Sequence, residues 1–148
     1  MTFPGSRLFR APDALAYFII RLMVGGVFLS EGVQKFLFPD EVGAGRFARI
    51  GLPSPEILGP FVGGFEIVCG VLVLAGLFTR LAVIPLLVIM AVAAWSTKLP
   101  ILLESGFWKM AHASRNDYCM IMGSIFLLLV GAGAWSLDAW RARRRGSR

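Results

Sequence analysis

Four stretches of this chain are apolar and long enough to cross a lipid bilayer as helices. A helix needs about 20 consecutive apolar residues to span the hydrocarbon core. The predicted spans cover about residues 14–38, 55–78, 81–97 and 116–135. Only 16% of the residues are charged, against about 25% in a typical soluble domain. We therefore expect a single all-α domain over residues 1–148, a polytopic four-helix bundle embedded in the lipid bilayer.

Two connections between these spans have the composition of short helices that lie on the membrane surface. Residues 98–115 are too many and too apolar for a plain loop. Residues 42–50 combine apolar Phe47 and Ile50 with basic Arg46 and Arg49. An ordinary polar loop is the alternative for this second segment. Within the spans, the small-residue patterns at residues 26–30 and 59–63 can let helices approach closely, although glycine is also simply common in membrane helices.

The basic residues predict how the bundle is oriented. Loops on the cytoplasmic side carry an excess of lysine and arginine, and this excess is largest if both termini lie inside. Residues 139–148 then form a basic cytoplasmic tail, together with Arg7, Arg10 and Arg80 on the same side. Most of the net charge of +6 is explained by this tail. The charge is therefore a signal of topology, and we expect no nucleic-acid partner.

Four charged residues lie inside the predicted spans and away from the end that holds Asp117, where a charge is costly unless it faces a partner or a cavity. They are Arg21, Glu31, Lys35 and Glu66. A rise of about 1.5 Å per residue places Glu31 about 10 Å and Glu66 about 16 Å below the outer edge. Lys35 follows Glu31 by one helical turn, which favours an ion pair between them. Glu66 is then left without a partner, which favours an outward-facing polar pocket built on Glu31, Lys35 and Glu66.

Further polar and aromatic side chains are expected at the same level as this pocket. The candidate ligand-binding residues are Gln34, Trp95, His112, Asn116 and Asp117. The alternative is an ion-pair network that only holds the helices together. Arg21 is assigned a structural role, because its long side chain can reach toward the inner end, to Asp13 or Asp138.

Metal and disulfide chemistry find little support in the sequence. The single histidine and the two cysteines do not form a ligand pattern typical of a metal site, and we predict no metal centre. Cys69 is expected about 21 Å below the outer edge and Cys119 about 5 Å below it, too far apart for a disulfide. The roles of both cysteines stay open.

The order and spacing of these features resemble the DoxX family of small four-helix membrane proteins. The resemblance runs from about residue 13 to residue 138. It rests on the following segments: Arg21-Leu22, Gly25, Phe28, Gly32 and Lys35-Phe36; Gly51-Leu52-Pro53; Glu66, Gly70 and Gly76-Leu77-Phe78-Thr79-Arg80; and the run from Gly131 to Asp138.

This resemblance implies a bundle in the bacterial cytoplasmic (inner) membrane and an association with redox processes. Relatives include the quinone-reducing subunit of a thiosulfate:quinone oxidoreductase and membrane partners of superoxide-detoxifying and thiol-metabolising enzymes. We accordingly expect a redox-associated subunit that binds quinone, or a small sulfur or thiol compound, in the pocket. Glu31 or Glu66 would then accept a quinol proton, Lys35 would stabilise a quinone oxygen and Trp95 would stack on the ring.

Several alternatives stay open at this stage. No intrinsic cofactor is evident, so electrons would come from a partner enzyme or from a sulfur substrate. The other function class is a non-enzymatic membrane scaffold or small-solute carrier. Homo-oligomerisation, and whether the chain is catalytic at all, are also undecided by the residues.

Overall fold

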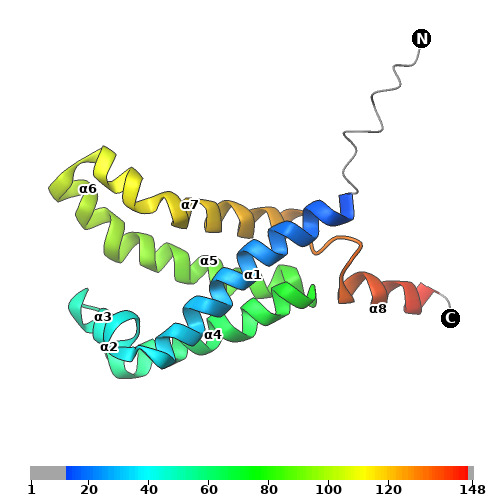
Figure 1. The fold of residues 1–148 in the computed structure, drawn as a ribbon, viewed down its shortest axis with the longest axis horizontal. Helices are drawn as coiled ribbons and strands as arrows, with labels where there is room; N and C mark the ends of the chain where they lie inside the picture. The colour runs from blue at the N-terminus through cyan, green and yellow to red at the C-terminus, as the bar shows by residue number, and fades with distance from the viewer. Residues whose placement is uncertain (1–12, 147–148) are drawn as a thin grey trace, which may run out of the picture.

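The computed structural model describes residues 13–146, and these residues form helices joined by short connections, with no strand among them (Figure 1). The predicted all-α class is confirmed. Arg7, Arg10, Arg148 and the side chains of Asp13 and Arg145 lie outside the described part. The elements are α1 (Asp13–Leu37), α2 (Pro39–Val42), α3 (Ala44–Arg49), α4 (Pro55–Ala75), α5 (Thr79–Ala93), the π-helical turn η2 (Ala94–Lys98), α6 (Leu99–Ser105), α7 (Phe107–Val130) and α8 (Leu137–Gly146).

Three helical stretches between residues 13 and 146 are long and apolar enough to cross a membrane. They are Ala14–Leu37, Pro55–Ala75 and Thr79–Ser105. The helix α7 has 24 residues, but its first turns carry Lys109, His112 and Arg115 and lower its mean hydropathy. A fourth span, in the predicted position near residues 116–135, therefore remains a prediction. The helix itself begins earlier, at Phe107, and ends at Val130, where Gly131 takes a φ of 91°.

The helices form two pairs that diverge toward the end of the molecule opposite both described termini (Figure 1). The first pair, α1 and α4, packs closely because glycines face each other across it. A Cβ atom at Gly25 would lie 2.8 Å from the Gly70 carbonyl oxygen, and one at Gly32 would lie 2.7 Å from that of Gly63. No side chain fits at these positions, and the backbones approach as small residues in membrane helices allow.

The small-residue patterns of the two helices are used differently. Gly63 lies in the contact between α1 and α4, whereas Gly59 packs against Ala44 of α3. Gly26 has no atom of the described chain near the position of a Cβ. Only the pattern at residues 59–63 therefore takes part in helix packing within the bundle.

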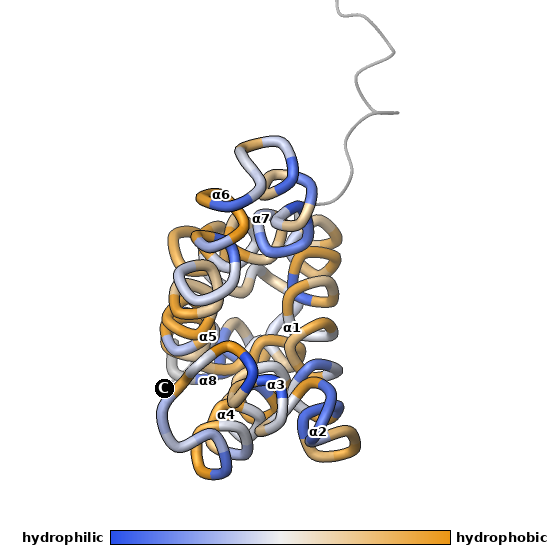
Figure 2. Tube along the Cα trace, turned by 90° about the vertical axis from the view of Figure 1, so that its left-hand side faces the viewer, coloured by the Kyte–Doolittle hydropathy of each residue, from blue (hydrophilic) through white to orange (hydrophobic). Residues whose placement is uncertain are grey.

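The second pair is α5 and α7, which contact each other along their length and close the ring of helices against α4 and α1. Figure 2 looks from the end that carries α2, α3 and α6, and shows α1 and α5 on opposite sides of this ring. The core lies where the four helices converge. It is made of apolar side chains, among them Val24, Phe28, Val73, Leu86 and Leu127.

Arg21 fastens the end of the bundle that lies next to α8. Its Nε donates a hydrogen bond to the Val73 carbonyl at 2.9 Å, and its Nη1 donates to the Trp135 carbonyl at 2.5 Å. Nη2 donates to the Leu74 carbonyl, and Nη1 also reaches the Ala132 carbonyl at 3.4 Å. The residue is buried. Arg21 is thus structural, but its hydrogen bonds run to backbone carbonyls and not to Asp138 as the sequence suggested.

Asp138 instead caps the first turn of α5. Its carboxylate accepts hydrogen bonds from the backbone N–H groups of Phe78 and Thr79, at 3.0 and 3.3 Å. These amides have no partner within the helix. The link between α4 and α5 is therefore held tightly at this end, and the two helices separate only toward the other end.

Candidate functional site

A cavity of about 200 Å³ lies between the diverging helix pairs, at the end that carries α2, α3 and η2. Side chains from α1, α3, α4, α5, η2 and α7 line it. Val27, Phe28, Met90 and Met120 give it apolar walls. Five of the residues predicted from the sequence also line it: Glu31, Lys35, Glu66, Asn116 and Asp117.

Lys35 is the centre of a cluster of three ionisable side chains. Its Nζ lies 2.6 Å from Glu66 Oε2 and 3.9 Å from Glu31 Oε2. The side chains of Lys35 and Glu66 are 8% and 5% exposed, whereas that of Glu31 is 44% exposed. A buried lysine beside a buried carboxylate is the pairing that a low-dielectric interior requires.

This geometry corrects the pairing expected from helical spacing. The i to i+4 relation favours Lys35 with Glu31 and leaves Glu66 without a partner. In the structure Lys35 points from α1 to α4 and pairs most closely with Glu66. Glu31 is the loosely held acid, and it faces the cavity. The reason is the close glycine contact between α1 and α4, which brings Glu66 within reach of Lys35.

Arg46 is a cavity residue that the sequence indicated only as part of a surface helix. It lies on α3 with Phe47, and both line the cavity. Phe47 is buried, which fixes α3 to the bundle, and Arg46 is exposed at the mouth. The pattern of Arg46 beside Phe47 was the available signal, but no local pattern shows that α3 folds back over the ionisable cluster.

The π-helical turn η2 contributes Ser96 and Thr97 to the cavity wall. Thr97 Oγ1 donates a hydrogen bond to the Ala93 carbonyl at 2.6 Å. Such turns within helices frequently occur at functional sites. Trp95, the residue predicted to stack on a ligand, is 75% exposed and borders a different surface groove with Lys98 and Leu99.

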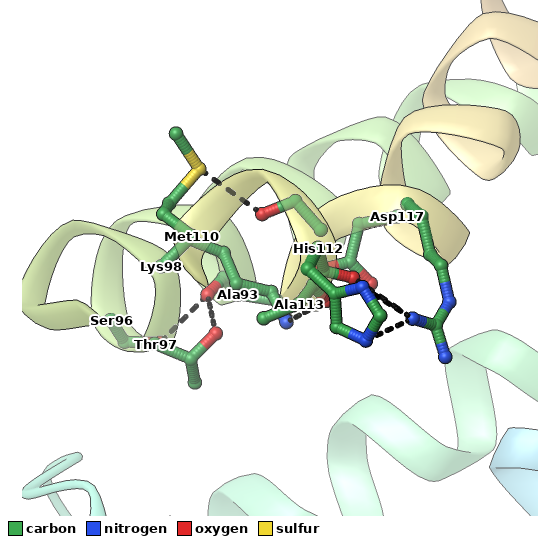
Figure 3. A network of polar contacts seen from close by, with 10 residues as sticks. Ala93, Ser96, Thr97, Lys98, Met110, His112, Ala113 and Asp117 are labelled. Atoms are coloured by element: carbon green, nitrogen blue, oxygen red, sulfur yellow. Dashed lines mark hydrogen bonds and ion pairs between the residues drawn. The ribbon is translucent and has the colours of Figure 1, made fainter. Parts of the chain in front are cut away.

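On α7, Asp117 pairs with Lys98 of η2, at 2.9 Å between Oδ2 and Nζ. Lys98 also donates a hydrogen bond to the Ala113 carbonyl at 3.0 Å (Figure 3). Lys98 therefore ties the end of the α5 helix to α7 beside the cavity. Asn116, next to Asp117, is exposed at the cavity mouth.

Two other predicted residues lie away from the cavity. His112 is exposed and its ring contacts the Arg115 guanidinium on the same helix (Figure 3). Gln34 donates a hydrogen bond from Nε2 to Ser30 Oγ at 2.9 Å, along the exposed side of α1. Both residues lie at the expected depth along their helices, but their side chains point to helix faces that do not border the cavity. A prediction from depth alone does not resolve this difference.

The cavity combines charged groups with apolar walls, and this combination suits a ligand with a small polar head or ring. Lys35 can donate a hydrogen bond to a ligand oxygen, and the loosely paired Glu31 can accept or release a proton. In the part of the chain that the structure describes, no group of three or more His, Cys, Asp or Glu side chains could hold a metal ion. Cys69 is buried, Cys119 is exposed, and both are free.

Comparison with known proteins gives one family and two relatives. The DoxX family model matches residues 16–99, a region that includes Glu31, Lys35 and Glu66. The uncharacterized membrane protein Rv3486 of Mycobacterium tuberculosis is 50% identical over 144 residues, covering 93% of this chain and 88% of that protein. The protein named "Putative oxidoreductase CatD" of Bacillus subtilis is 28% identical over 133 residues, covering 87% and 90%. No solved structure matches the chain.

Proposed function

The chain belongs to the DoxX family of membrane proteins, and we propose that it is a redox-associated subunit that binds a quinone, or a small sulfur or thiol compound, in the polar cavity. One observation carries the proposal. Lys35 and Glu66 are paired in the wall of a cavity that also has apolar walls, while Glu31 is partly exposed and held only loosely. A site for proton transfer to a ligand needs a positioned acid of this kind.

The proposal includes an arrangement in the cytoplasmic membrane. In it α1, α4, α5 and α7 span the bilayer, both termini are cytoplasmic, and residues 139–148 form a basic tail on that side. The 24 residues of α7 reach about 36 Å as a helix, which is enough for the hydrocarbon core. The helices α2, α3 and α6 then lie at the outer interface. The cavity opens on the outer side.

The chemistry follows from the groups in the cavity. Oxidation of two thiols by a quinone forms one disulfide and one quinol, so two electrons and two protons pass from sulfur to the quinone. Glu31 is placed to take a proton from a thiol and to return it to a quinone oxygen. Lys35 is placed to donate a hydrogen bond to that oxygen. Phe47, in the cavity wall, takes the aromatic role that the sequence assigned to Trp95.

The name of the Bacillus subtilis relative, "Putative oxidoreductase CatD", supports redox chemistry over other uses of the cavity. The competing function is a scaffold or small-solute carrier. It is favoured by the fact that Lys35 and Glu66 join α1 to α4, as a purely structural ion pair would. A substitution of Glu31 distinguishes the two functions, because Glu31 faces the cavity and contributes little to helix packing.

The test uses purified full-length protein and two conservative variants. Glu31→Gln removes the acid in the cavity, and Glu104→Gln removes an exposed acid on α6 as a matched control. We expect bound quinone, detected by mass spectrometry, in the unmodified protein and in Glu104→Gln. Thiol-dependent or thiosulfate-dependent reduction of added quinone in proteoliposomes should be lost in Glu31→Gln. The absence of both bound quinone and reduction, together with solute flux into the liposomes, would favour the carrier instead.

A further inference from the structure

A second, wholly apolar groove adjoins the polar cavity on the outer surface of the bundle. It has a volume of about 340 Å³ and runs between α4 and α5. Phe61, Val62 and Phe65 of α4 line it, together with Pro85 and Ile89 of α5. Val62 and Ile89 line the polar cavity as well. The two spaces therefore meet at one pair of side chains, one from each helix.

The groove has a clear origin in the fold. The helices α4 and α5 are held together by the short link at residues 76–78, where Asp138 caps α5. They separate toward the cavity end (Figure 1). Pro85 lies inside α5 and has no N–H for the helical hydrogen-bond ladder. Phe61 and Phe65, whose ring centroids lie 4.9 Å apart, are both exposed along the groove.

In the proposed membrane arrangement this groove faces the lipid. On one side of Val62 and Ile89 lies the cavity, whose wall contains Lys35, Glu31 and Glu66. On the other side, toward the lipid, lies the groove, whose wall contains only apolar groups. A molecule that fits both spaces has a polar head and an apolar tail. A tailless polar compound fits only the cavity, and an acyl chain without a polar head fits only the groove.

We propose that the ligand of the cavity is an amphiphile with a single hydrocarbon tail, which passes between Val62 and Ile89 and lies in the groove between α4 and α5. This inference rests on the proposed function and narrows it to a quinone with an alkyl or isoprenoid tail. The ligand reaches the cavity sideways from the bilayer. The polar head lies against Lys35 and Glu31, and the tail contacts Phe65 and Pro85.

The experiment compares two quinones that share a head and differ in the tail. The probes are decylubiquinone and the tailless 2,3-dimethoxy-5-methyl-1,4-benzoquinone, bound in radiolabelled form to full-length protein in lipid nanodiscs. Empty nanodiscs correct for partition into lipid. The groove is filled from α5 by Val88→Trp and from α4 by the smaller change Phe65→Trp, and neither residue lines the polar cavity. Val71→Trp on the exposed side of α4 lines neither space and is the matched control.

Overfilling the groove should raise the Kd of decylubiquinone about tenfold in Val88→Trp and leave that of the tailless quinone within about twofold. Phe65→Trp should act in the same direction, and Val71→Trp should change neither Kd. The inference is overturned if the groove variants Val88→Trp and Phe65→Trp leave decylubiquinone binding unchanged, or weaken the binding of both quinones equally. If the unmodified protein binds neither quinone, the quinone form of the proposed function fails together with the inference, and this result is distinct from tail-independent binding.

Discussion

Replacing Lys35 by methionine should destabilise the bundle more than replacing either acid beside it. The substitution keeps the length and the apolar part of the side chain but removes the charge. Glu66 would then be a buried carboxylate without its cation, 2.6 Å away in the native protein. Breaking a buried ion pair by removing one partner costs about 3–5 kcal/mol in the free energy of unfolding. We expect Lys35→Met to fall in this range.

The two acids should differ from each other. Glu66→Gln leaves Lys35 buried, but Glu31 is 3.9 Å away and can move closer, so we expect a smaller loss of about 2–3 kcal/mol. Glu31→Gln removes a half-exposed and loosely paired group, and its cost should stay below about 1 kcal/mol. The predicted order of destabilisation is therefore Lys35→Met, then Glu66→Gln, then Glu31→Gln.

The assay is reversible unfolding in mixed micelles with increasing sodium dodecyl sulfate, followed by far-ultraviolet circular dichroism. Glu104→Gln, on the exposed surface of α6, is the control for a change of charge alone. The double variant Lys35→Met/Glu66→Gln removes both charges and should be more stable than Lys35→Met, because no buried carboxylate is left unpaired. Equal losses for Lys35→Met and Glu31→Gln, or simple additivity in the double variant, would refute the reasoning.

Three further predictions concern the packing and the orientation of the helices. Arg21→Met should lower the free energy of unfolding by about 3 kcal/mol, because buried carbonyl groups lose their donor. Arg21→Lys should recover only part of this loss, because an ammonium lacks the guanidinium fork. The same unfolding assay checks both variants. Gly32→Ala should lower the free energy of unfolding by about 1–3 kcal/mol, since its Cβ would lie 2.7 Å from the Gly63 carbonyl oxygen. Equal stability of Gly32→Ala and Gly26→Ala in the same assay would contradict a tight contact between α1 and α4. Reporter fusions after residue 50 should be external and those after residue 79 internal, and an external signal at residue 79 would exclude the proposed topology.

The ionisable cluster shows how far local sequence reasoning reaches. Glu31, Lys35 and Glu66 could be singled out because a charge in an apolar span needs a partner or a cavity. Counting residues along each helix placed them at similar depths, and the structure brings them together. The choice of partner for Lys35 could not be made in this way. It depends on how α1 and α4 are rotated about their axes and how closely they approach.

Helix rotation also explains the residues that were expected in the cavity but do not line it, namely Trp95, His112 and Gln34. Each lies at a suitable position along the chain, yet each points away from the cavity. Ser96 and Thr97 line the cavity because a π-helical turn sets the direction of these side chains. Arg46 joins them because α3 folds back onto α4. Neither the π-helical turn nor the folding of α3 onto α4 is indicated by a local sequence pattern.

The sequence by itself determined the helical class, the apolar stretches suited to a bilayer, the resemblance to DoxX proteins and the few charges that require an explanation. These properties belong to the chain itself, because hydropathy and side-chain charge do not depend on how the helices pack. Only the tertiary structure decided that Lys35 pairs with Glu66, that Glu31 faces a cavity, and that an apolar groove meets this cavity at Val62 and Ile89. These features depend on the separation and rotation of the helices, which the glycine contacts between α1 and α4 and the capped turn before α5 impose.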